Sequence, residues 1–239
     1  MRLAFLTAEW RYLAMLNYVV DPNVLGPHVP KGTELDHRNG NHFVSLVGFL
    51  FLDTHILSLP AFFHQNFEEV NLRFYVRRTV ASDSRAGVVF TREMVPLPLV
   101  SQVARITYNE PYRTVPMQHA VVETDGELQS VEYRFGGPRD QCRLAAHVEG
   151  PAQSIRVGSD EEFLSDRPWG YTRQRDGGTI EYRVEHPRWN VWPDARCELD
   201  GPLQEFYDEP FASILRGAPA SAFVAHGSAV AVHFPERIA

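Results

Sequence analysis

Short segments that alternate apolar and polar residues constrain the fold of this chain more than any other feature. The clearest one runs from Val70 to Arg77, where Val, Leu, Phe and Val alternate with Asn, Arg, Tyr and Arg. Successive side chains of a β-strand point to opposite faces, so this pattern predicts a strand with one buried face. Further strands are predicted at 44–52, 87–93, 131–135, 180–184 and 221–234, the last as one strand or as a hairpin split by Gly227.

Helices are predicted to be few and short. Asp21 and Pro22 open a capped helical turn that stops before Pro30. Ser159 stands three residues before Glu162, the spacing of a capping box, which predicts a short helix over 160–165. Prolines and glycines are scattered along the chain and form no linker. We therefore expect one domain over 1–239, mainly β (α+β), folded as an antiparallel barrel or sandwich with a few short helices.

Composition excludes several partners. The net charge of −7 and a pI near 5.8 argue against nucleic acid, because binders of nucleic acid concentrate Lys and Arg on one face. The longest apolar run, Phe43 to Leu52, is far shorter than the about 20 residues that span a bilayer, so no membrane partner is expected. Cys142 and Cys197 form no paired motif and are expected to be reduced thiols. The predicted location is cytoplasmic. The sequence does not decide between a monomer and a homo-oligomer.

Motifs for common cofactors and nucleophiles are missing from the sequence. It contains no glycine-rich phosphate loop, no G-x-S-x-G elbow and no H-E-x-x-H. Ten histidines are present, but none has ligand spacing supported by neighbouring Cys or carboxylate residues. We therefore predict no metal site and no cofactor.

The polar side of the 70–77 strand is the most chemically capable part of the sequence. It carries Glu69, Asn71, Arg73, Tyr75 and Arg77. In a barrel, alternate residues face the interior, where a Glu beside an Arg can orient a carboxylate or move a proton. A solvated outer face with cross-strand ion pairs is the commoner arrangement for such a row, and both interpretations stay open on pattern alone.

Longer stretches resemble a known family. The segments 7–18, 66–77, 169–178 and 181–187 are similar to the YqjF-like family of uncharacterised bacterial proteins, and the resemblance covers nearly the whole chain. That family is remotely similar to the acetoacetate decarboxylase-like superfamily, whose fold is a strand-rich cone or barrel around a buried polar pocket. The resemblance implies this fold for the chain, without an established activity.

The same resemblance assigns site residues. Arg11 falls where the decarboxylases carry an arginine associated with the substrate carboxylate, and Glu69 corresponds to a pocket glutamate. Residues 105–112 resemble the segment that ends in their nucleophilic lysine, but Tyr112 stands at that position here. The only lysine, Lys31, lies in a turn-like segment. A phenol cannot form an imine with a ketone, so amine-dependent decarboxylation is not expected.

The predicted site combines these residues. Arg11 and Arg105 would offer forked donors to a carboxylate, with Asn71 and Arg73 as further binding residues, while Glu69 and Tyr112 would transfer protons or hydrogen-bond. The predicted function is therefore to bind a small organic acid or carbonyl compound, as a binding protein or as a lyase or isomerase that forms no Schiff base. The alternative is a structural or partner-binding domain that has lost the ancestral activity, its buried charges serving as an ion-pair network.

Overall fold

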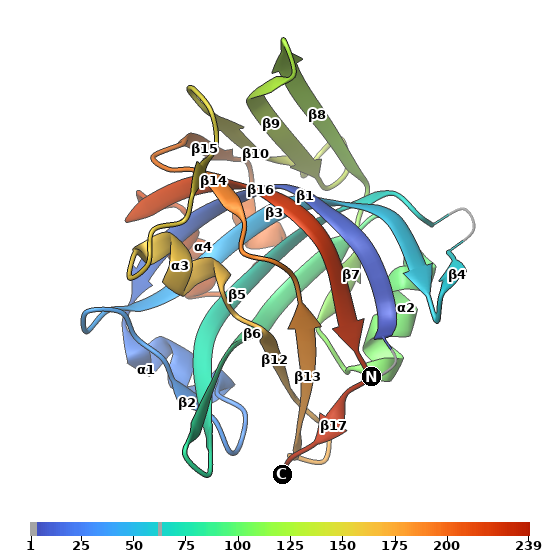
Figure 1. Cartoon of the computed structure of the whole chain (residues 1–239), viewed down its shortest axis with the longest axis vertical. Helices are drawn as coiled ribbons and strands as arrows, with labels where there is room; N and C mark the ends of the chain where they lie inside the picture. The colour runs from blue at the N-terminus through green and yellow to red at the C-terminus, as the bar shows by residue number, and fades with distance from the viewer. Residues whose placement is uncertain (1–3, 62–63) are drawn as a thin grey trace.

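The computed structural model of this chain describes residues 4–61 and 64–239. Within them the structure is mainly β, as predicted, and consists of two sheets and a few short helices (Figure 1). The strands of the large sheet are β1 (Ala4–Val20), β2 (Glu34–Leu35), β3 (His42–Ile56), β4 (Leu59–Pro60), β5 (Phe67–Val80), β6 (Asp83–Val95), β7 (Tyr112–Thr114), β11 (Gln153–Ser154), β12 (Trp169–Arg173), β13 (Thr179–Glu185), β14 (Asn190–Trp192), β16 (Ser221–His233) and β17 (Glu236–Arg237).

The large sheet closes into a ring. Its strands follow the order β11-β14-β16-β1-β3-β5-β6-β12-β13-β17, and β13 also pairs with β16. Because β13 bonds to both β12 and β16, the seven strands β16, β1, β3, β5, β6, β12 and β13 enclose an interior. Among the described residues the pairings are antiparallel, apart from those of β6 with β12 and with β7.

A small antiparallel sheet covers part of the ring. It consists of β8 (Met117–Thr124), β9 (Glu127–Phe135), β10 (Cys142–His147) and β15 (Arg196–Asp200). Figure 1 shows β8 and β9 projecting at the top of the molecule. The helices are α1 (Pro22–Leu25), η1 (Gly26–His28), α2 (Pro98–Thr107), α3 (Asp160–Ser165), η2 (Leu203–Glu205) and α4 (Phe211–Leu215). No helix in the described part of the chain is long and apolar enough to cross a membrane.

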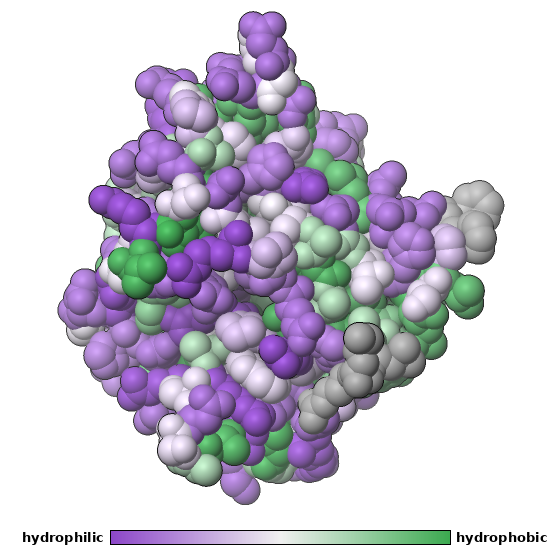
Figure 2. All heavy atoms as spheres, viewed as in Figure 1, coloured by the Kyte–Doolittle hydropathy of each residue, from purple (hydrophilic) through white to green (hydrophobic). Residues whose placement is uncertain are grey.

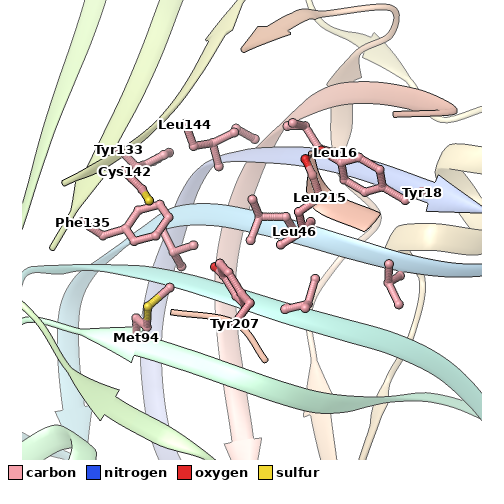
Figure 3. Close-up of a cluster of buried hydrophobic side chains, with 14 of the residues drawn as sticks. Leu16, Tyr18, Leu46, Met94, Tyr133, Phe135, Cys142, Leu144, Tyr207 and Leu215 are labelled. Atoms are coloured by element: carbon pink, nitrogen blue, oxygen red, sulfur yellow. Dashed lines mark hydrogen bonds between the residues drawn. The ribbon is translucent and has the colours of Figure 1, made fainter. Parts of the chain in front are cut away.

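Two apolar clusters lie on opposite faces of the large sheet. We call the first the outer core: Val70, Leu72 and Phe74 of β5 pack there with side chains of the small sheet, such as Tyr133 and Leu144. Figure 3 shows part of it, with Leu144, Tyr133 and Phe135 facing residues of the large sheet. The second, the inner core, lies inside the ring and includes Leu13, Met15, Val47, Phe49, Phe51, Phe67, Tyr75 and Trp189. Figure 2 shows mostly hydrophilic residues on the visible surface, with smaller, separate hydrophobic areas.

Several local predictions are confirmed. The helix at 160–165 begins after Ser159, whose hydroxyl accepts a hydrogen bond from the backbone N–H of Glu162, and Asp21 caps α1. Cys142 and Cys197 are free thiols. The segment 221–234 is not a hairpin: it forms the single strand β16, with Gly227 at φ +83° inside it. A side chain at this glycine would collide with the backbone oxygen of Trp10, so Gly227 lets two strands approach closely instead of turning the chain.

The interpretation of the polar row as a solvated outer face is wrong for most of its members. Glu69, Asn71, Arg73 and Tyr75 are buried, and only Arg77 is substantially exposed, beside Glu34. Both faces of β5 are covered, because the ring closes over one face and the small sheet over the other. Alternation along one strand cannot show such double coverage, since it reports only that the two faces differ.

Candidate functional site

Glu69 is the central polar residue of the ring interior. It lies on β5 and is 3% exposed. Its carboxylate accepts one hydrogen bond from Asn71 Nδ2 at 2.9 Å and one from the Tyr112 hydroxyl at 2.9 Å. Burial raises the pKa of Glu69 to about 7, although both hydrogen bonds and the nearby charge of Arg73 lower it. At neutral pH this group therefore exists in both protonation states.

A second carboxyl stands beside it. Asn71 on β5 pairs with Glu93 on β6, and Glu93 pairs in turn with Tyr112 on β7, so the three residues form a row across adjacent strands. Glu93 is buried, and its Oε2 atom has no hydrogen-bond partner. Burial, followed by the charges of Glu110 and Glu69, raises the pKa of Glu93 well above its ordinary value.

Glu110, just before β7, is the third buried carboxyl. Its Oε1 atom accepts hydrogen bonds from Thr172 Oγ1 at 2.5 Å and from the Tyr182 hydroxyl at 2.8 Å, while its Oε2 atom has no partner. Burial raises the pKa of Glu110 to about 8, more than the two hydrogen bonds lower it. Burial also raises the pKa of Tyr112 and of Tyr182 well above the ordinary value, so both phenols are neutral hydrogen-bond donors at physiological pH.

These groups line a cavity of about 320 Å³ inside the ring. Most of its other lining residues are apolar or aromatic, among them Trp10, Phe49, Phe90, Tyr108 and Trp169. Helix α2 lies against it through Val100, Val103 and Ala104. A pocket with apolar walls and a few convergent polar groups is the usual form of a small-molecule site.

Two arginines also line the cavity. Arg73 donates to the backbone oxygen of Leu164 at 3.0 Å, and its Nε atom has no partner. Arg167 pairs with Asp36, and its guanidinium lies 3.9 Å from the ring centre of Phe163. Arg73 therefore has an N–H group that can donate a hydrogen bond to a ligand, whereas the guanidinium of Arg167 already forms an ion pair with Asp36.

Arg11 lies outside this cavity. Its guanidinium bonds to Glu9 at 2.6 Å and to His226 Nδ1 at 3.1 Å, and the side chain is 29% exposed. Leu13 faces the inner core, so strict alternation would place Arg11 inside as well. A bulge intervenes: Tyr12 has φ +54°, and the β1–β3 register shifts between Arg11 and Ala14. The extra residue reverses the alternation, turning Trp10 inward and Arg11 outward.

Arg105 is also absent from the wall of the interior cavity, although it lines a separate surface pocket together with Glu110 and Tyr112. It is exposed on α2, where Val100, Val103 and Ala104 occupy the face toward the cavity. A step of 100° per residue after Ala104 carries Arg105 away from that face. The structure therefore brings Glu69, Tyr112, Asn71 and Arg73 together in the interior cavity, whereas Arg11 and Arg105 lie outside it, Arg105 beside Tyr112 in the surface pocket. Lys31 is exposed and is not among the residues that line the cavity.

Three residues of the site were missed in the sequence: Glu93, Glu110 and Tyr182. Glu110 stands two residues before Tyr112 in an extended segment, and that spacing alone could have placed both on one side. Tyr182 belongs to a predicted strand, on the side that also carries Val184, another residue of the cavity wall. Glu93 carries no comparable signal, because its role depends on the pairing of β6 with two other strands. Within 4–61 and 64–239, no group of three or more His, Cys, Asp or Glu has an arrangement that could hold a metal ion.

Solved structures identify the class of fold. The chain is similar to the acetoacetate decarboxylase from Legionella pneumophila subsp. pneumophila str. Philadelphia 1, with TM-score 0.66, 11% identity, and 98% of this chain and 87% of that chain covered. An acetoacetate decarboxylase-like enzyme from Sphingomonas wittichii RW1 matches with TM-score 0.63 and 15% identity, covering 98% and 92%. The enduracididine biosynthesis enzyme MppR, complexed with pyruvate, matches with TM-score 0.65 and 11% identity, covering 98% and 90%. The protein has an acetoacetate decarboxylase-like fold.

Its family follows from the sequence comparison. The chain belongs to the DUF2071 family, described as "Uncharacterized conserved protein (COG2071)", which matches residues 7–229. A search of curated proteins returns no significant match. The resemblance found in the sequence, to uncharacterised proteins and more remotely to the decarboxylase-like superfamily, is confirmed.

Proposed function

We propose that this protein binds a compact carbonyl compound in the ring interior and uses Glu69 and Tyr112 to transfer a proton at the carbon beside the carbonyl. The observation that carries the proposal is the buried Glu69 carboxylate, held by the Tyr112 hydroxyl at 2.9 Å in the wall of a cavity of about 320 Å³. The open cavity favours a ligand-binding role over a purely packed interior.

The proposed chemistry is general acid–base catalysis. A base with a pKa of about 7 is ionised in a large fraction of molecules at neutral pH and still strong enough to accept a proton. The Glu69 carboxylate would take the proton from the α-carbon, and the C–H electron pair would form the carbon–carbon double bond of an enolate. Once Glu69 is protonated it no longer needs the hydrogen bond from Tyr112, and the single O–H of this neutral phenol would turn to donate to the enolate oxygen. If the Glu69 proton first exchanges with solvent, delivery of the solvent hydrogen to the same carbon completes an exchange; delivery of the proton to another carbon completes an isomerisation.

A carbonyl compound suits this cavity better than an anion does. Three carboxyls line the wall, and the negative charge of a bound carboxylate would raise the pKa of Glu69 further and keep the proposed base protonated. Arg73 is the residue that would receive an organic acid, because its Nε atom has no partner. An imine route is not part of the proposal, since Tyr112 and Arg113 follow Pro111 and Lys31 is exposed.

The test is exchange of α-protons for deuterium, followed by proton NMR with cyclohexanone in D₂O. We expect the protein to accelerate the exchange and Glu69→Gln to slow it by about 10²- to 10⁴-fold, the usual range for a lost general base. Tyr112→Phe should slow it by a smaller factor. Glu127→Gln changes an exposed residue of β9 and serves as the matched control, with an unchanged rate. Equal rates for the wild type and a folded Glu69→Gln variant would contradict the proposal.

A further inference from the structure

The cavity wall has a surplus of hydrogen-bond acceptors. Asn71 Oδ1, Glu93 Oε2 and Glu110 Oε2 have no partner, and their residues are 2%, 3% and 4% exposed. The amide of Asn71 is oriented by its Nδ2 atom, which donates to Glu69, so its oxygen is the atom left over. Buried acceptors without partners are rare and call for a donor. Here three of them line one cavity.

The positive charges of the same wall do not pair with Glu93 or Glu110. Among the described residues, no arginine, lysine or histidine forms an ion pair with Glu93 or Glu110. Arg73 lowers the pKa of Glu69 through its charge, and Arg167 is paired with Asp36. Burial raises the pKa of Glu93 and of Glu110, and neighbouring carboxylates add to the rise: Glu110 and Glu69 at Glu93, and Glu69 at Glu110. A cation in the cavity would remove this penalty.

Aromatic side chains form much of the remaining wall. Trp10, Tyr108, Trp169 and Tyr182 all line the cavity with the carboxyls. Aromatic rings attract cations through the negative potential of their faces. Two unpartnered donors, Trp10 Nε1 and Arg73 Nε, lie on β1 and β5, where a ligand's oxygen could accept from them. The lining therefore suits a ligand with a cationic nitrogen and a separate oxygen acceptor.

We propose that the ligand of this cavity is a compact ketone or aldehyde that also carries a protonated amine, whose N–H groups donate to Glu93, Glu110 and Asn71. The carbonyl half of this inference rests on the proposed function of Glu69 and Tyr112. The amine half rests on separate residues and is tested separately. The acids of the wall thus select the charge of the ligand, while Glu69 and Tyr112 act on its carbonyl.

Three ring compounds of nearly equal size separate these two halves. They are cyclohexanone, 4-piperidone and piperidinium. In 4-piperidone a protonated nitrogen replaces the methylene of cyclohexanone opposite the carbonyl. Piperidinium has the cation but no carbonyl. Isothermal titration would give the three dissociation constants, with the concentration of 4-piperidone corrected for its hydrate by NMR. We expect 4-piperidone to bind at least about tenfold more tightly than cyclohexanone, and piperidinium to bind measurably.

Variants identify the residues responsible. Glu93→Gln and Glu110→Gln keep the size of the side chain and remove the charge, so each should reduce the preference for 4-piperidone to within about twofold. Glu127→Gln, exposed on β9, should leave the preference unchanged. Circular dichroism would confirm that each variant is folded.

The outcomes separate the two proposals. Binding of piperidinium together with failure of α-proton exchange would sustain the amine site and overturn the function proposed for Glu69 and Tyr112. Equal affinity for 4-piperidone and cyclohexanone would overturn the amine site, whatever the exchange rates are. An undiminished preference in both glutamine variants would overturn the assignment to Glu93 and Glu110.

Discussion

Strand β5 has two buried faces with opposite chemistry. The face toward the small sheet carries Val70, Leu72 and Phe74, which pack in the outer core with no polar group of their own to satisfy. The face toward the ring interior carries Glu69 and Arg73 at comparable burial. The outer face therefore gains stability from every buried side chain, whereas the inner face loses free energy by holding carboxyls away from water. A row of residues that is costly to bury, beside an open cavity, is the arrangement expected of a binding site.

The largest expected effect tests the outer face. Phe74 is fully buried in the outer core, and Phe74→Ala removes its ring and leaves a cavity. We expect the free energy of unfolding to fall by about 3 to 5 kcal/mol, measured by urea denaturation. Thr79→Ala, at an exposed position of the same strand, should change it by less than about 0.5 kcal/mol. A loss below about 1 kcal/mol for Phe74→Ala would show that the outer core is not tightly packed.

Packing between the two sheets gives the next effect. A Cβ added at Gly48 of β3 would lie 2.7 Å from the ring of Tyr133 and 2.9 Å from Leu144. Gly48→Ala should destabilise the protein by about 1 to 3 kcal/mol, because the outer core has no room for a methyl group. Gly26→Ala, where nothing lies within 4 Å, is the matched control. Similar urea midpoints for the two variants would contradict the close approach of the small sheet.

The inner face should be destabilised by its own carboxyls as pH rises. The pKa of Glu110 is about 8 in the folded state against 4.5 when exposed, and that of Glu69 is about 7. Between about pH 4.5 and 8 the folded state binds more protons than the unfolded state, so the free energy of unfolding falls as pH rises through this window.

Replacing one of these acids should flatten that dependence. Glu110→Gln cannot ionise, and at about pH 9 it should be more stable than the wild type by an amount of order 1 kcal/mol. At about pH 4 the difference should nearly vanish, because the carboxyl is then protonated in both states. Thermal denaturation across this range measures the effect, with Glu127→Gln as control. A wild type that gains stability steadily from pH 5 to 8, with no change on Glu110→Gln, would show that Glu110 is not buried in this way.

The smallest effect concerns a residue that the sequence assigned to the site. Arg11 pairs with Glu9 at a partly exposed position outside the cavity. Arg11→Ala should cost about 0 to 1 kcal/mol and leave the affinity for cyclohexanone unchanged. Arg73→Ala, inside the cavity, is the comparison. A marked loss of ligand binding in Arg11→Ala would return this residue to the site.

Local sequence patterns were sufficient for much of the fold. Alternation predicted the strands that became β5, β9 and β13, because it follows directly from the geometry of an extended chain, and β3 and β6 were also predicted as strands. Capping residues predicted the position of α3. The long strand β1 and the helix α2 were not predicted from local pattern, although residues of both line the cavity. The resemblance to related sequences placed Glu69 and Tyr112, and the structure brings these two into contact.

The remainder depended on how distant strands meet. The β-bulge at Tyr12 adds one residue to β1, so the side chain of Arg11 points out of the ring instead of into it. The alternation pattern on either side of the bulge does not reveal this change. Glu93 and Glu110 became neighbours of Glu69 only through the pairing of β5, β6 and β7. Closure of the ring then decided that the polar face of β5 is buried and not solvated. Periodicity records which residues share a side of a strand, but burial depends on what covers that side, and this is set by contacts between residues far apart in the chain.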